Sequence, residues 1–174
     1  MKDLRYPIGQ FKPEPFSATA KDKWVNDIKN LPEELEAAVH NLTEAQLNTP
    51  YREGGWTLNQ VVHHLTDSHM NSFITFKLGL TENNPTALPY NEKSFATLAD
   101  VIQVAPGISV NIVHYLCYRW YTLLQNMSEG DFNRTIVHPE LGGKMNLWTF
   151  WGMCVWHGKH HIAHITSLRE EKKW

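Results

Sequence analysis

The residues of this chain that are best suited to metal binding or catalysis are the histidines of its C-terminal segment. Ten histidines occur among the 174 residues, and His157, His160, His161 and His164 follow one another closely. On a helix, residues four apart are neighbours on one face, about 6 Å apart, so His157 and His161 can hold one metal ion between them. A helical projection at about 100° per residue puts this pair near the centre of the apolar face. His164 also points inward and His160 lies toward the edge of that face, so these two form a competing, less central pair.

A buried histidine in most proteins only finds a hydrogen-bond partner, and that ordinary interpretation applies to each of these residues alone. Several neutral imidazoles in one apolar core are costly unless their nitrogens are satisfied, and a bound cation satisfies several at once. The pattern therefore favours metal ligation by His157 and His161. A catalytic zinc site has three protein ligands and one open position, so a third ligand must come from another helix.

The candidates for the third ligand are His63, His64 and His69, which share one expected helix. His69 falls on its apolar side, which indicates a packing role, and His63 points elsewhere. His64 heads a polar stripe that continues through Gln60, Ser68, Asn71 and Thr75. Such a stripe is typical of a pocket wall but also of a solvated helix edge, and periodicity alone does not choose between them.

Four long amphipathic segments are expected to carry these residues. The first runs over 18–39, as one kinked helix or two short ones, and the second begins at the cap Thr57 and runs to about residue 80. The third covers about 109–127 and the fourth about 146–173. A brief turn at 43–48 and a long connection over 81–106, with one turn at 94–98, link them, and no strand is predicted. The expected fold is an all-α four-helix bundle with one long crossover.

Length and composition limit the partners of the chain. A length of 174 residues suits one domain over 1–174, in which prolines make 1–16 an extended N-terminal arm. The 16 Lys and Arg against 18 Asp and Glu leave no positive field for nucleic acid. No apolar run approaches the ~20 residues of a membrane span, so no membrane partner is expected. Two cysteines exclude a disulfide scaffold and favour a cytoplasmic protein.

Two stretches around the histidines resemble the metal motifs of the DinB-like proteins. Trp56–Leu65 looks like the first motif, with His64 at a ligand position, and His157–His161 looks like the second, a His-x-x-x-His on the last helix. The similarity is closer still to the YfiT subgroup, whose members are provisionally assigned as metal-dependent hydrolases. It extends over nearly the whole chain, through Leu4–Gly9, Tyr51–Trp56, His63–Ser72, Phe76–Leu78, Arg119–Trp120, His138–Glu140 and Trp156–Ile165.

This resemblance implies a four-helix bundle that binds one divalent metal per subunit through His64, His157 and His161, and that forms a homodimer. Zinc is the expected ion and nickel the alternative. The wider family commonly has glutamine three residues after the last ligand, where this chain has His164, a histidine that the closer subgroup shares. In that subgroup a histidine often precedes the x-Arg-Trp of the third helix, where this chain has Cys117, so no role is assigned to that position.

The expected function is a metal-dependent hydrolase of a small-molecule substrate, with the open coordination position taken by water or substrate. The same position could take a low-molecular-weight thiol, since relatives in the superfamily are transferases that use thiols such as bacillithiol. An alternative of another class is a non-catalytic, metal-stabilised, stress-associated binding protein. Four protein ligands would favour that structural role, whereas three histidines in a cleft would favour catalysis.

No carboxylate has the signature of a general base, and the catalytic residues are not assigned. Asp67 could orient His64 or could be a solvated charge, the more ordinary interpretation. Arg119 could bind a substrate carboxylate or form a structural ion pair. The two cysteines, Cys117 and Cys154, are expected to pack as small apolar residues. His63, His69 and His160 belong to the motifs without a defined role, and His40, His114 and His138 are interpreted as ordinary surface, loop or hydrogen-bonded residues.

Overall fold

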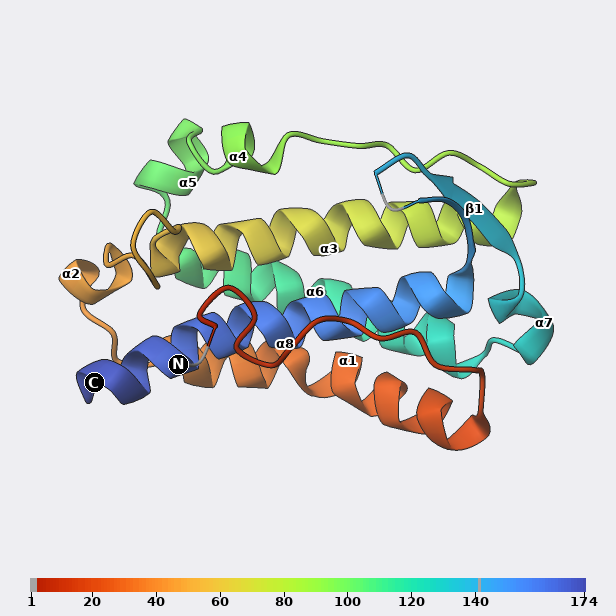
Figure 1. Cartoon of the computed structure of the whole chain (residues 1–174), viewed down its shortest axis with the longest axis horizontal. Coiled ribbons are helices and arrows are strands. Elements are labelled where there is room, and N and C mark those ends of the chain that lie inside the picture. Colours follow the sequence, from red (N-terminus) through yellow and green to blue (C-terminus); the bar gives the residue numbers. More distant parts are fainter. Residues whose placement is uncertain (1–2, 141) are drawn as a thin grey trace.

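Four long helices lie side by side in a computed structural model that describes residues 3–140 and 142–174 (Figure 1). They are α1 (Ala18–Val39), α3 (Leu58–Thr81), α6 (Pro106–Gln125) and α8 (Leu147–Lys172). The prediction of an all-α four-helix bundle with a long crossover is therefore confirmed, and none of the described helices is long and apolar enough to span a membrane. The shorter elements are α2 (Glu44–Leu47), α4 (Glu92–Phe95), α5 (Ala99–Gln103), α7 (Glu129–Phe132), β1 (Thr135–His138) and β2 (Gly143–Asn146).

The first residues of α3 show why the sequence marks this helix so clearly. The Thr57 side chain accepts a hydrogen bond from the backbone N–H of Gln60, and the Gln60 side chain accepts one from the N–H of Thr57. This capping box satisfies two N–H groups that a helix start otherwise leaves unpaired, and it fixes where the helix begins. The same device, with Thr43 and Gln46, opens α2 as expected. The first segment is one helix, α1, with Pro32 inside it.

The crossover between α3 and α6 is fastened to α3 by hydrogen bonds from three polar side chains of that helix. Asn59 Nδ2 donates to the carbonyl of Val101 at 2.7 Å, and Gln60 Nε2 donates to that of Ala96 at 2.9 Å. His63 contacts Val104 O at 3.1 Å and Ser109 Oγ at 2.8 Å through its two ring nitrogens. The turn expected at 94–98 is present, with the N–H of Thr97 donating to the Ser94 carbonyl at 3.1 Å and that of Leu98 to the Phe95 carbonyl at 3.0 Å. It joins two short helices, α4 and α5, that were not expected.

A β-hairpin follows α7, so the expectation of no strand is wrong. Strands β1 and β2 pair antiparallel, from Thr135 opposite Asn146 to His138 opposite Gly143. Each strand has four residues and only Ile136 is buried, so the alternation is too short to be recognised. The hairpin ends at Asn146, whose side chain accepts the N–H of Thr149 and caps α8.

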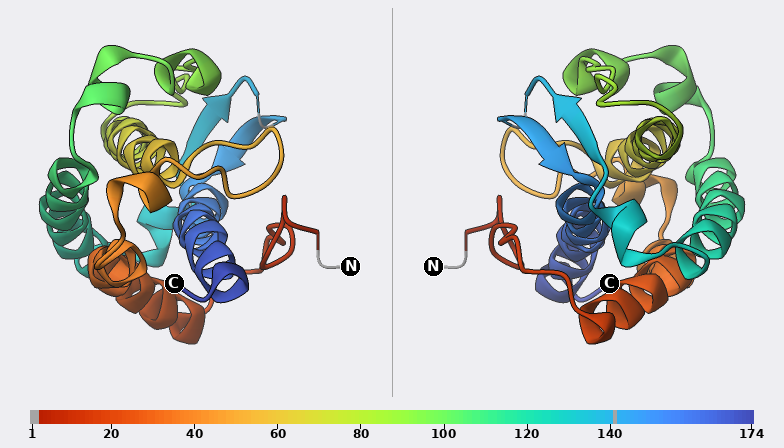
Figure 2. Two further views of the ribbon diagram at one scale, coloured as in Figure 1. Left: turned by 90° about the vertical axis from the view of Figure 1, so that its left-hand side faces the viewer. Right: turned by 90° about the vertical axis from the view of Figure 1, so that its right-hand side faces the viewer.

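Helix α8 is packed on more than one side, as the end-on views of the bundle show (Figure 2). Trp151 of α8 and Trp120 of α6 are fully buried in the core. Gly152 of α8 is buried against the ring of Trp24, where an added Cβ would come within 2.4 Å. The N-terminal arm lies along the outside of α8, where Trp156 Nε1 donates to the Gly9 carbonyl at 3.2 Å.

Candidate metal centre

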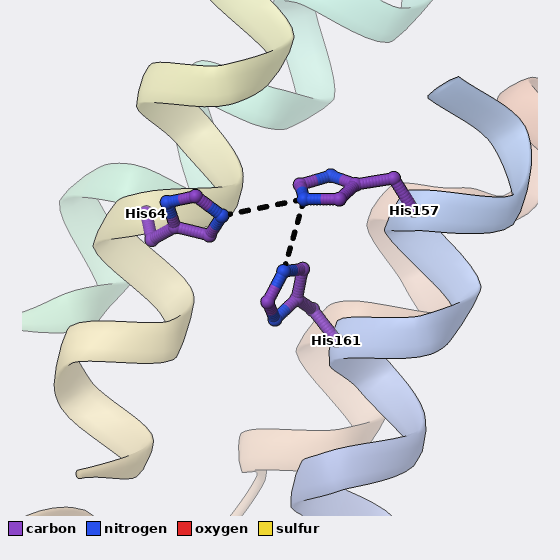
Figure 3. Close-up of side chains that lie close together, drawn as sticks. All are labelled: His64, His157 and His161. Carbon is purple, nitrogen blue, oxygen red and sulfur yellow. Dashed lines mark hydrogen bonds between the residues drawn. The ribbon is translucent and has the colours of Figure 1, made fainter. Parts of the chain in front are cut away.

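Three histidines from two helices point toward one another in the bundle (Figure 3). His64 extends from α3, and His157 and His161 from successive turns of α8. The Nε2 atom of His157 lies 3.3 Å from that of His64 and 3.0 Å from that of His161. One ring nitrogen from each of the three lies within 4.8 Å of the others, and no other group of three His, Cys, Asp or Glu residues in the described part of the chain meets this criterion.

Neighbouring aromatic rings fix the orientation of these imidazoles. The Trp56 indole, immediately before the cap of α3, lies 4.6 Å from the His64 ring and stacks on His161 at 6.4 Å, measured between ring centroids. Ser68 Oγ lies 3.4 Å from Nδ1 of His157, the ring nitrogen that faces away from the other two histidines. The rings are therefore held in place by contacts on α3 and by the loop that precedes it.

Burial keeps all three histidines neutral. It lowers the pKa of His64 to about 4, with smaller contributions from the nearby His69 and His160. It lowers the pKa of His157 and His161 well below the ordinary value of about 6.5, and the surrounding histidines lower both further. A neutral imidazole has a free lone pair on one ring nitrogen, which is the form that binds a metal.

The residues present fit a divalent cation. Two ligands at the 2.0–2.1 Å zinc–nitrogen distance in tetrahedral geometry would lie about 3.3 Å apart, close to the two nitrogen separations observed. Without a cation, Nε2 of His157 is either one N–H donor or one lone-pair acceptor, so it cannot form a good hydrogen bond to both of the other histidines at once. Ligation through Nε2 would hold the proton of the His161 ring on Nδ1, a buried atom that has no hydrogen-bond partner among the described residues.

Two cavities meet at His64 and His157. The wide cavity, about 650 Å³, is lined by Tyr51, Arg52, Trp56, Lys93 and the histidines of α8, among others. The narrow cavity, about 270 Å³, is lined by Ser68, Ser72, Tyr90, Glu140, Phe150, Met153 and Cys154, among others. Trp156 and Glu92 border both. Because both cavities reach the same two histidines, a substrate in either one can approach the centre.

The competing pair, His160 and His164, is also brought together. Their Nε2 atoms lie 3.0 Å apart, the same separation as in the other pair of α8. Both rings are buried, with His160 stacked on Trp156 and His164 stacked on Tyr51. The helical projection predicts that His160 lies at the edge of the apolar face. The structure buries it there because the N-terminal arm covers that edge, and the Tyr6 ring lies 5.8 Å from the His160 ring between centroids. No third metal-binding side chain joins this pair among the described residues.

The remaining histidines separate into tethered, packed and exposed residues. His63 fastens the crossover, and His69 is buried with Nδ1 donating to the Leu65 carbonyl at 2.9 Å, in agreement with the packing role predicted for it. His40 and His114 are exposed. His138 was interpreted as a surface or loop residue, but it is half-buried and lines the narrow cavity. The hairpin that places it there was itself not predicted.

The other side chains considered for chemistry lie outside the centre or are inert. Asp67 makes no hydrogen bond to His64 in the described part of the chain, and burial and Asp100 raise the pKa of its carboxyl. Arg119 is exposed on α6, with its guanidinium over the Phe73 ring, and it lines neither cavity. Burial raises the pKa of Cys117 and Cys154 to about 12, so both remain thiols, as expected of packing residues.

Comparison with known proteins agrees with this architecture. A family model described as the DinB superfamily matches residues 28–165. A Bacillus mycoides protein and a Bacillus cereus protein, both named provisionally as metal-dependent hydrolases, are 49% and 48% identical over the full length of both chains. The structure of YfiT from Bacillus subtilis, described as a probable metal-dependent hydrolase with an unusual four-helix bundle topology, superposes with a TM-score of 0.95 over 98% of each chain at 46% identity. The four-helix bundle protein TT2238 shares only the fold, with a TM-score of 0.54 at 17% identity over 84% of this chain and 98% of the other. The chain therefore belongs to the DinB superfamily.

Proposed function

We propose that the protein is a metal-dependent hydrolase of a small molecule, with one zinc ion per subunit bound by His64, His157 and His161. Nickel is the alternative ion. The observation that carries this proposal is the convergence of three neutral imidazoles where two cavities meet, with no fourth His, Cys, Asp or Glu in that cluster among the described residues. A structural zinc site has four protein ligands, whereas a catalytic site leaves one position open.

When bound at such a site, a divalent ion polarises a carbonyl and activates water for attack. The contribution of the chain is to hold and orient the ion. Ser68, at His157 Nδ1, supports one ligand from behind, as partners of metal-bound histidines commonly do. Trp56 and Trp156 both line the wide cavity, where their large rings exclude water from part of it. The names given to the Bacillus relatives support the same reaction class.

Metal analysis combined with substitution tests the ligand set. The purified protein is expected to hold one zinc per subunit, and His64→Ala, His157→Ala and His161→Ala are each expected to lose it while keeping their helix content by circular dichroism. His114→Ala, at an exposed histidine of α6, is the matched control and should keep the metal. Stoichiometric metal in the triple variant would contradict the assignment. Full metal retention with no turnover in a screen of esters and amides would favour the non-catalytic binding protein.

A thiol transferase is a second candidate, favoured by the presence of two cavities rather than one. Because both reach His64 and His157, a thiol such as bacillithiol in one cavity and an electrophile in the other could approach the same centre. A metal would favour the thiolate form, and that sulfur would displace the leaving group of the electrophile. Metal-dependent conjugation of a low-molecular-weight thiol to a haloaromatic is the expected result for this candidate, and hydrolysis without thiol consumption would reject it.

We also propose that the protein is a cytoplasmic homodimer that pairs through the outer face of α6, and that it uses neither nucleic acid nor membrane as a partner. Ile108, Tyr115 and Tyr118 are 55%, 71% and 70% exposed on this helix, and Ile102 of α5 is 66% exposed. Exposed large apolar and aromatic side chains of this kind are typical of protein interfaces. Sedimentation analysis should show a dimer that Tyr115→Glu with Ile108→Glu converts to a monomer; a wild-type monomer would contradict the proposal.

A further inference from the structure

Arg52 is a half-buried cation without a carboxylate partner. It lines the wide cavity, and its guanidinium makes hydrogen bonds only to neutral acceptors, from Nε to Tyr51 Oη at 3.2 Å and from Nη1 to the Glu53 carbonyl at 2.9 Å. Within residues 3–140 and 142–174 no ion pair includes it, and Nη2 has no partner. An arginine side chain offers five donors in a planar fork, and this one has most of them available.

The position of Arg52 is fixed by the loop before α3. Its guanidinium lies over the Tyr51 ring at 5.3 Å, and Tyr51 stacks in turn on His164 with a centroid separation of 3.9 Å. The backbone N–H of Tyr51 donates to the Trp56 carbonyl, and that of Gly55 donates to the Arg52 carbonyl, each at 3.0 Å. Since Trp56 also contacts His64, the guanidinium is held relative to the metal centre by a short series of packed rings. Little ordering would be required when an anion binds.

The charges of the two cavities differ in sign. The wide cavity has Arg52 and Lys93 against the single acid Glu92, whereas the narrow cavity has Glu92 and Glu140 and neither arginine nor lysine. The other acid near Arg52 on the N-terminal arm, Asp3, is engaged by Arg5 through two side-chain hydrogen bonds of 3.1 Å. An anionic substrate group is therefore favoured in the wide cavity and disfavoured in the narrow one.

We propose that Arg52 binds the carboxylate of the substrate in the wide cavity. A single planar guanidinium matches a carboxylate through two parallel hydrogen bonds. The apolar atoms of Phe150, Met153 and Cys154 in the narrow cavity suit an apolar group at the other end of the molecule. The substrate class is thus a small carboxylic acid whose amide or ester bond lies between these two ends, at the three histidines. The position of that bond rests on the proposed hydrolase function, whereas the carboxylate subsite does not.

A pair of probes that differ only in charge tests the subsite. Benzoylglycine has a carboxylate, an amide and a phenyl ring, and benzoylglycinamide replaces its carboxylate with a neutral carboxamide. Calorimetric titration of the zinc-loaded and the metal-free protein should show tighter binding of benzoylglycine, by about tenfold or more. Arg52→Met, which keeps an unbranched side chain over Tyr51, should reduce this preference to about onefold. Arg119→Met, at the exposed arginine of α6, should leave it unchanged, and circular dichroism checks that both variants are folded.

The outcomes separate the two proposals. Equal binding of both probes, binding of neither, or a preference that survives Arg52→Met would each overturn the carboxylate subsite. Hydrolysis is measured independently on the same samples. A carboxylate preference that depends on Arg52, in a protein that hydrolyses no amide or ester, would reject the hydrolase function and retain the subsite. Arg52→Lys should keep part of the preference, because it retains the charge but not the fork.

Discussion

Helix α8 has two histidine pairs with the same spacing and different surroundings. His157 and His161 are four residues apart with Nε2 atoms 3.0 Å from each other, and His160 and His164 repeat both features. Only the first pair meets a ring nitrogen from a second helix, that of His64. The second pair lies between the Trp156 and Tyr51 rings instead. Spacing on one helix therefore produces a pair, and the facing helix decides whether the pair becomes part of a three-histidine cluster that could hold a metal ion.

Single substitutions in each pair provide the largest expected contrast. His161→Ala removes one of three ligands and should weaken zinc binding by more than about 100-fold, since even partners behind a ligand alter affinity by 10–100-fold. His160→Ala leaves all three ligands in place and should change zinc binding less than tenfold. Competition with a chromophoric chelator measures both affinities. Comparable losses in the two variants would mean that the second pair also takes part in ligation.

The first pair shows how much of the candidate site can be predicted from the sequence. The i and i+4 spacing on an apolar face pointed to His157 and His161, and the polar stripe on the next long helix left His64 as a candidate that only the family resemblance selected. The structure brings these three together. The cap Thr57 also predicted where α3 begins, because a side-chain cap is a local interaction that the sequence displays directly.

What could not be predicted depends on contacts between distant segments. His138 and Glu140 reach the narrow cavity only because a hairpin of four-residue strands folds over the bundle, and such short strands have no periodic pattern. Arg52 shows no helical or strand periodicity, and its place beside the centre follows from the packing of Tyr51 on His164. Arg119 was the arginine considered for a substrate carboxylate, yet it lies on the exposed face of α6.

A smaller effect on zinc affinity is expected from Ser68, which contacts His157 of the first pair. Ser68→Ala removes the hydroxyl 3.4 Å from Nδ1 of His157 and should weaken zinc binding by about tenfold, the lower end of the usual range because the contact is long. Ser72→Ala, one turn further along α3 in the same narrow cavity, is the matched control and should have no effect on affinity. A chelator competition on the two variants distinguishes a loss specific to Ser68 from a general change in the cavity.

For the second pair we expect an effect of pH on stability rather than an effect on metal binding. Burial, then His160 and Arg52, lower the pKa of His164 to about 3 in the folded protein, against about 6.5 in the unfolded chain. As pH falls below 6.5 the unfolded chain takes up the proton first, so this contribution to stability is complete above pH 6.5 and decreases toward pH 3. After an allowance for solvent screening, the titration of His164 should lower the free energy of unfolding by about 1 kcal/mol as the pH falls from 6.5 to 5. Urea unfolding of the metal-free protein should therefore depend less on pH in His164→Gln than in the wild type over this interval. Parallel stability curves from pH 7 to 4 would show that His164 titrates alike in both states, and the second pair would then differ from the first, in which burial lowers the pKa of both histidines.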